Sequence, residues 1–186
     1  KLCSKERAGY IVEALHKYLA NEYMCRALCF CVNKRHADFM AEQLSLYGFN
    51  AQSLTSDTPS DKRKQLAKEL REGAIHYLCV VDIFNEGVDI PEVDTVLFLR
   101  PTESLTIFLQ QLGRGLRLSV GKTELTVLDF VAQSNRKYDF ASRFRALMLN
   151  PEKNIVKQIK DGFTLLPSGC SIVMEKKARQ YILDNI

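Results

Sequence analysis

The stretch ALCFCV at residues 27–32 is a short run of apolar side chains that contains no charge. The runs YLCVV (77–81), DTVLFL (94–99) and LTVLDFV (125–131) have a similar apolar character. Such runs are typical of strands that are covered on both faces, and strands of this kind occur in parallel sheets. We therefore expect these segments to form a mainly parallel sheet of five to seven strands.

Helical patterns lie between the apolar runs. Apolar residues recur at helical spacing in 36–47 and in 59–72. The second helix has clear end signals, with Thr58 as its N-cap, Pro59 at its first position and Gly73 just after its last. Strands that alternate with helices of this length predict an α/β, doubly wound domain with helices on both faces of the sheet.

The regions outside the alternating pattern suggest three parts. Residues 1–24 contain an amphipathic helix over 5–20, which is either a covering helix or a linker. Residues 25–150 hold the α/β domain and close with a helix over 134–149. Residues 151–186 form an extension or the start of a further domain, with a terminal helix from about 174.

Composition limits the number of domains and the kinds of partner but does not identify a function. A chain of 186 residues suits one domain with a small appendage, and its net charge of +4 permits a polyanionic partner but does not require one. No run approaches the roughly 20 apolar residues of a membrane span, so no membrane partner is expected. None of the six cysteines forms a CxxC pair, and we expect reduced, packed thiols in a protein of the cytoplasm.

The segment GRGLRLSVGKTE (113–124) contains Gly-Lys-Thr, the end of a phosphate-binding P-loop. The full pattern, GxxxxGK[ST], needs a glycine at position 116, and that residue is leucine. Apolar residues on both sides of SVGKT favour two extended segments joined by a turn. We therefore do not predict a nucleotide site at Lys122.

Two other segments combine into a candidate anion site. DIFNEGVDIPEVD (82–94) is a glycine-containing turn with several acidic residues, and it follows a predicted strand. QQLGRGLRL (110–118) places Arg114 and Arg117 three residues apart, on one face if the segment is helical. Ligands of parallel α/β sheets bind at the carboxyl ends of the strands. Two guanidinium groups beside an acidic turn there could clamp a polyphosphate.

Four segments, in this order and spacing, resemble motifs IV, IVa, V and VI of the second RecA-like motor domain of superfamily 2 helicases. They are ALCFCVNKRHADFMAEQL, SLTSDTPSDKRKQLAKELREG, VVDIFNEGVDIP and FLQQLGRGLRL. The resemblance covers about residues 25–132 and implies a RecA-like three-layer domain. NEGVDIPEVD, LRPTES and QQLGRGLRL are similar to the DNA-directed branch that includes type III restriction enzyme helicase subunits and their DEAD/DEAH-box relatives.

The resemblance assigns one group of residues to ATP. Arg114 and Arg117 correspond to the motif VI arginines that reach the γ-phosphate. Asp89 corresponds to the motif V acid that binds the ribose, in a turn made by Gly87. Gln110 begins motif VI and would link the γ-phosphate site to the nucleic-acid side.

A second group corresponds to residues that touch or orient the strand backbone: Asn33 in motif IV, Ser56 in motif IVa and Asp82 in motif V. Many relatives have threonine immediately before the position of Asp82, where it contacts a phosphate, whereas this chain has Val81. Val81 has no hydroxyl, so this chain departs from the family pattern at the phosphate contact of motif V.

Motors of this superfamily hydrolyse ATP between two domains, and the first carries a P-loop and an Asp-Glu pair that holds Mg²⁺. This chain has neither sequence. The resemblance implies that ATP and Mg²⁺ are bound mainly by an absent first motor domain, from which residues 1–24 would be the linker. DNA and that first domain are the implied partners.

Two alternatives stay open at this stage. One is a non-catalytic nucleic-acid-binding or regulatory α/β module. The other is a separate α/β enzyme that uses its cysteines or histidines. His36 and His76 have no carboxylate or nucleophile in a recognisable arrangement, so we expect structural or surface roles for both.

Overall fold

The computed structural model describes residues 2–81, 90–100, 124–130, 140–148, 154–163 and 171–186. The chain forms two compact units, which are described separately. The first comprises Lys1–Pro101 and Phe108–Phe130, and the second comprises Thr102–Ile107 and Val131–Ile186. No helix in the described ranges is long and apolar enough to cross a membrane.

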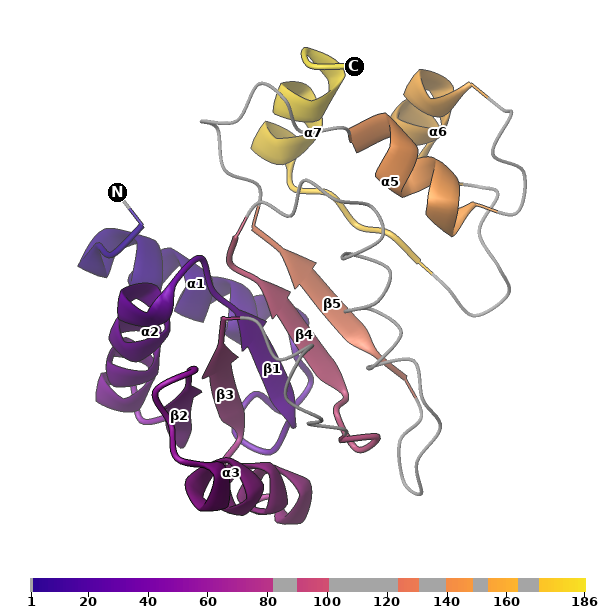
Figure 1. Ribbon diagram of the computed structural model, residues 1–186. Coiled ribbons are helices and arrows are strands. Elements are labelled where there is room, and N and C mark those ends of the chain that lie inside the picture. The colour runs from indigo at the N-terminus through magenta and orange to yellow at the C-terminus, as the bar shows by residue number, and fades with distance from the viewer. Residues whose placement is uncertain (1, 82–89, 101–123, 131–139, 149–153, 164–170) are drawn as a thin grey trace. The chain divides into compact units, whose positions relative to one another are not determined.

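The first unit is built on a five-stranded sheet in the order β2-β3-β1-β4-β5 (Figure 1). Every strand pair is parallel, which confirms the predicted sheet. β1 lies in the middle, paired with β3 on one side and with β4 on the other. The strands are β1 (Ala27–Phe30), β2 (Ala51–Leu54), β3 (Tyr77–Val80), β4 (Thr95–Phe98) and β5 (Thr126–Asp129).

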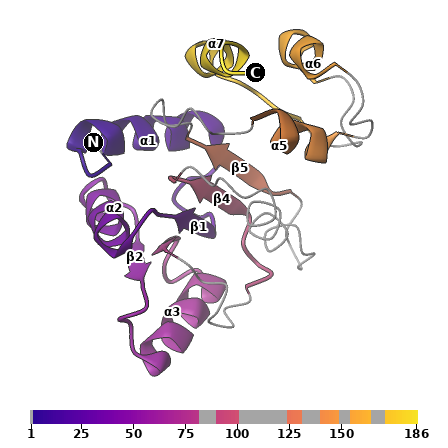
Figure 2. The ribbon, with the colours of Figure 1, turned by 45° about the horizontal axis from the view of Figure 1, so that its top comes forward.

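Helices cover both faces of this sheet, as the α/β pattern predicts. Figures 1 and 2 show α1 (Lys5–Tyr18) and α2 (Lys34–Leu46) over one face and α3 (Ser60–Glu72) over the other. Side chains of a strand alternate between the two faces, and all residues of β1, β3 and β4 are buried. The apolar runs of these three strands therefore reflect burial on both faces, whereas β5 is only partly buried, contrary to the prediction for 125–131.

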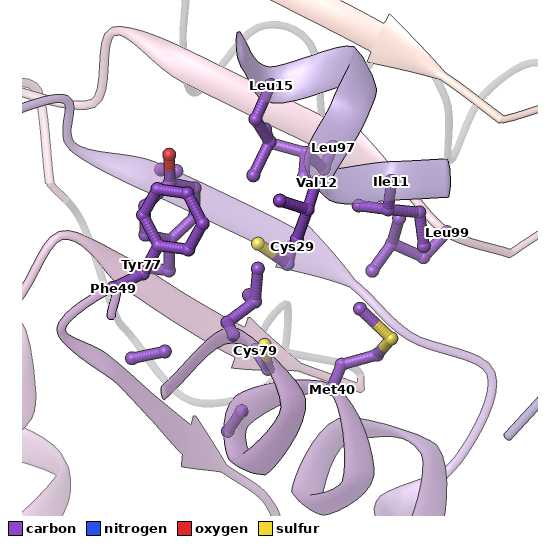
Figure 3. Close-up of a cluster of buried hydrophobic side chains, with 14 of the residues drawn as sticks. Ile11, Val12, Leu15, Cys29, Met40, Phe49, Tyr77, Cys79, Leu97 and Leu99 are labelled. Atoms are coloured by element: carbon purple, nitrogen blue, oxygen red, sulfur yellow. The ribbon is translucent and has the colours of Figure 1, made fainter. Parts of the chain in front are cut away.

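The core beneath α1 and α2 contains the cysteines of the central strands (Figure 3). Cys29 and Cys79 are register partners on β1 and β3, and both are fully buried. Contact with the Cys29 thiol, together with burial, raises the pKa of Cys79 well above its usual value. The predicted packing of thiols is confirmed for Cys25, Cys29, Cys31 and Cys79, whereas Cys170 lies outside the described residues.

The ends of α3 confirm one sequence prediction and correct another. Gly73 ends the helix in the left-handed conformation, with φ of 79°, as predicted. The prediction that Thr58 caps the other end is wrong, because Pro59 occupies the N-cap position and makes no side-chain cap bond. The Thr58 hydroxyl instead accepts a hydrogen bond from the Thr55 N–H at 3.0 Å, so the preceding turn uses it.

In its described residues, the second unit has three helices: α5 (Phe140–Leu147), α6 (Ile155–Asp161) and α7 (Lys176–Leu183). They share a small apolar core, in which the rings of Phe144 and Phe163 lie 5.1 Å apart. α7 begins close to the predicted start at 174. α6 is only seven residues long and was not predicted, because one short turn sequence capped by Asn154 carries little periodic signal.

His36 is fully buried and fixes the connection between β1 and α2. The Asn33 side-chain oxygen accepts from the His36 backbone N–H at 2.9 Å, and His36 Nδ1 accepts from the Val32 N–H at 3.2 Å. These reciprocal bonds resemble a capping box. The ring must be neutral to accept at Nδ1. Burial, with the nearby charge of Arg7, lowers the pKa of His36 from 6.5 to about 4.

The low pKa of His36 predicts a loss of stability in acid. The unfolded chain binds a proton at this ring near pH 6.5, and the folded chain does so only near pH 4, so the contribution of the neutral ring is lost as pH falls between these values. His36→Gln retains an acceptor without titrating in this range. We expect the difference in unfolding free energy between wild type and this variant to shift against wild type from pH 7 to 4 in urea denaturation. Parallel pH profiles would contradict this assignment.

Candidate functional site

Four loops of the first unit begin at one edge of the sheet, because all five strands run in the same direction. Asn33 follows β1, the turn Thr55–Thr58 follows β2, Val81 follows β3, and Arg100 closely follows β4. The carboxyl ends of parallel strands form the usual ligand edge of such sheets. This edge is therefore the candidate functional site.

Asn33 is exposed and serves as the N-cap of α2. Its side-chain oxygen is bonded to the His36 N–H, so the amide NH₂ group is left to donate to another molecule. The backbone N–H groups of Lys34 and Arg35 lie in the first turn of the helix, where no intrahelical acceptor exists. The loop after β1 thus presents several hydrogen-bond donors to solvent.

The turn after β2 is held by its own threonines. Thr58 Oγ1 accepts from the Thr55 N–H, and Thr55 Oγ1 accepts from the Asp57 N–H at 3.3 Å. Arg63 of α3 fixes the turn from below, with bonds of 2.6 Å to the Thr58 carbonyl and 2.8 Å to the Ser56 carbonyl. Ser56 is therefore exposed on a turn that these bonds hold, and among the described residues its hydroxyl and N–H have no hydrogen-bond partner.

An ion pair joins the loops that follow β1 and β2. Lys34 Nζ lies 2.6 Å from Asp57 Oδ1, although β3 separates the two strands in the sheet. Lys34 and Asp57 are immediate neighbours of Asn33 and Ser56. The structure therefore brings together the two predicted strand-contacting residues that it describes.

The first turn of α2 begins Lys34-Arg35-His36 and contains no acidic residue. α1 and α3 have an acid in their first turns, whereas α5, α6 and α7 have none. Because a helix N-terminus is already electropositive, cations there are unfavourable unless an anion is nearby. The charges at the start of α2 therefore favour the binding of an anion at this edge.

The histidines have structural contacts. His36 binds the backbone of Val32, and His76 Nδ1 lies 3.2 Å from the carbonyl of Cys25 at the opposite edge of the sheet. The described ranges contain no group of three metal-ligating side chains. Neither histidine has the carboxylate or nucleophile partner that catalysis would require.

The other predicted site residues lie outside the described residues. They are Asp82, Gly87, Asp89, Gln110, Arg114 and Arg117. Their assignments to the ATP site and to motif V stay predictions.

Sequence reasoning missed the contributions of Lys34, Asp57 and Arg63. The two adjacent cations at a helix start, Lys34 and Arg35, were a usable signal for the first of them. Nothing in the sequence pairs Lys34 with Asp57, because the partners are 23 residues apart and follow strands that are not adjacent.

Curated relatives of the chain include two fungal helicases. The putative ATP-dependent helicase IRC3 of Saccharomyces cerevisiae is 34% identical over 108 residues, which is 58% of this chain and 16% of the relative. The putative mitochondrial ATP-dependent helicase irc3 of Schizosaccharomyces pombe is 34% identical over 103 residues, 55% of this chain and 17% of the relative. The chain spans less than a fifth of the length of either protein.

Solved structures with the same fold include domains of DEAD-box proteins. The E. coli DEAD-box protein SrmB superimposes with a TM-score of 0.62 at 20% identity, covering 92% of this chain and 93% of that chain. The yeast DEAD-box splicing factor Prp28 gives a TM-score of 0.66 at 16% identity, covering 96% and 34%. At these identities the likeness concerns the RecA-like α/β fold.

The family model described as "Helicase conserved C-terminal domain" matches residues 10–119, which include β1 to β4 and the loops at the candidate site. This match covers more than half of the chain. The chain therefore belongs to the helicase conserved C-terminal domain family.

Proposed function

We propose that this chain is the second motor domain of an ATP-dependent DNA helicase or translocase. The observation that carries the proposal is the placement of Asn33 and Ser56 at one edge, joined through the Lys34–Asp57 ion pair, in a chain of the helicase C-terminal family. The exposed donors of this edge and the basic start of α2 suit the phosphates of a nucleic-acid strand.

In this proposal two domains together form the ATP site. A first RecA-like domain with a P-loop binds most of ATP and its Mg²⁺. This chain contributes Asp89 to the ribose and Arg114 and Arg117 to the γ-phosphate, with Gly87 and Gln110 as supporting residues. Arginines delivered in this way stabilise charge in phosphoryl transfer and are worth roughly 10³ to 10⁵ in rate. Strand contacts by Asn33, Ser56 and Asp82 would then be coupled to closure of the two domains.

The choice of DNA rests on the similarity of NEGVDIPEVD, LRPTES and QQLGRGLRL to the DNA-directed branch of the superfamily. A reducing compartment such as the cytoplasm suits the buried free thiols and is part of the proposal. Stimulation of ATP turnover by single-stranded DNA and by RNA of equal length tests the choice of strand. Stronger stimulation by RNA would reject DNA as the substrate.

The two arginines provide the first test. In the full-length protein, Arg114→Ala or Arg117→Ala should lower DNA-stimulated ATP turnover by at least about a hundredfold, because the missing charge acts in the transition state. Strand affinity without nucleotide should stay nearly unchanged. Lysine at either position should restore little activity, since an ammonium group cannot form the bidentate contact.

Lys122→Ala is the matched control for this experiment. It removes a cation from the Gly-Lys-Thr segment nearby in sequence and should leave turnover within about twofold of wild type, since the sequence predicts no nucleotide site at this lysine. If the Lys122 variant lost turnover and both arginine variants retained it, the assignment of the ATP site would be reversed.

The isolated chain provides a second test. Because it supplies only part of a nucleotide site, it should bind ATP weakly or not at all in isothermal titration calorimetry. Its binding to single-stranded DNA should be weak and should fall steeply as salt rises, since counterion release dominates such binding. Sub-micromolar affinity for ATP would contradict the division of the site between two domains.

A further inference from the structure

The Lys34–Asp57 ion pair lies at the proposed strand-binding edge, where an acidic side chain is unexpected. Phosphates are anionic, so a carboxylate beside them lowers affinity unless it has another role. The side chains of Lys34 and Asp57 are 48% and 75% exposed. Both groups are therefore accessible to a strand, and the pair can open without exposing buried surface.

The turn that carries Asp57 does not depend on the carboxylate of this residue. The hydroxyls of Thr55 and Thr58 and the guanidinium of Arg63 make the bonds that fix the turn. Among the described residues, the Asp57 carboxylate bonds only to Lys34, at 2.6 Å. Its contribution to the structure is therefore confined to the neighbouring cation.

The position of Lys34 at a helix N-terminus is favourable only if an anion lies nearby. Lys34 is the first residue of α2 and is followed by Arg35, and the N-terminal dipole end of the helix is also positive. Without a strand, Asp57 supplies the negative charge that this position lacks. With a strand, a phosphate could supply the same charge to the same ammonium group.

We propose that Asp57 is a competing counter-ion, which holds Lys34 in the strand-free domain and is displaced from it by a strand phosphate. This inference rests on the proposed nucleic-acid function of the edge. It means that strand binding includes the opening of the ion pair. Asp57 thereby weakens the grip of this domain on nucleic acid, in contrast to Asn33 and Ser56, which strengthen it.

The test measures binding of a fluorescent oligothymidylate to the full-length protein without nucleotide, by anisotropy over a range of salt concentrations. Asp57→Asn should raise affinity about two- to fivefold at low salt, which is the range expected for an exposed ion pair. The gain should shrink as salt rises, because salt screens exposed charges.

Glu72→Gln is the matched control. Glu72 forms an exposed ion pair with Lys68, at 3.7 Å, in the last turn of α3 and away from the candidate edge. This variant makes the same change in net charge as Asp57→Asn. It should alter affinity by less than the Asp57 variant does, since its cation does not face the strand.

A double-variant cycle separates competition from simple repulsion. If Asp57 acts by holding Lys34, then Asp57→Asn should give little or no gain in a Lys34→Ala background. An undiminished gain in that background would show that Asp57 acts by its own charge, and would overturn the proposal. Unchanged or lower affinity of the Asp57→Asn single variant would overturn it as well.

The same data distinguish failure of this inference from failure of the proposed function. A wild-type protein that binds no strand at low salt would reject nucleic-acid binding at this edge, and the counter-ion role with it. Strand binding that is weakened by Lys34→Ala but insensitive to Asp57→Asn would retain the proposed function and reject only the role of Asp57.

Discussion

The parallel pairing of β1 with β3 and β4 is the constraint on which the first unit depends. β1 is buried along its whole length, with helices over both faces and a strand on each side. Parallel neighbours require a crossover connection, so α2 and α3 must return the chain to the opposite edge each time. As a result, every loop that follows a strand begins at the same edge. Residues distant in the sequence, such as Asn33 and Ser56, therefore reach one surface.

The sequence predicts this architecture well where the signal is periodic. Apolar runs identify the buried strands, and helical spacing with Gly73 identifies α3, because burial on two faces restricts residue type strongly. The hydrogen-bond partner of a single side chain is harder to predict when several backbone groups lie nearby. Thr58 is a good N-cap by type, but its hydroxyl oxygen accepts a hydrogen bond from the Thr55 N–H of the preceding turn instead of from a helix N–H. α6 was not predicted because its seven residues form only about two helical turns, too few for a recognisable apolar pattern.

The candidate site was also predictable only in part. Asn33 and Ser56 were identified from motifs in a fixed order along the chain, and the parallel sheet places both at the same edge. The Lys34–Asp57 contact depends on strand order, since β3 inserts between the strands that precede the two residues. Strand order in a doubly wound sheet is a property of the whole chain. A pattern of residue types along one segment therefore contains no information about this pair.

The candidate edge contains a buried side chain that fixes the backbone and an exposed ion pair that can open. His36 is inaccessible and neutral, so it holds the turn at Val32 and Asn33 without adding charge to the surface. Lys34 and Asp57 are exposed, and such pairs contribute only about 0 to 1 kcal/mol to stability. Loss of the exposed pair therefore leaves the fold nearly unaffected, whereas it changes the charge presented to a ligand. In the proposed function, an arrangement of this kind would allow the affinity for a strand to vary while the backbone donors at the edge stay in place.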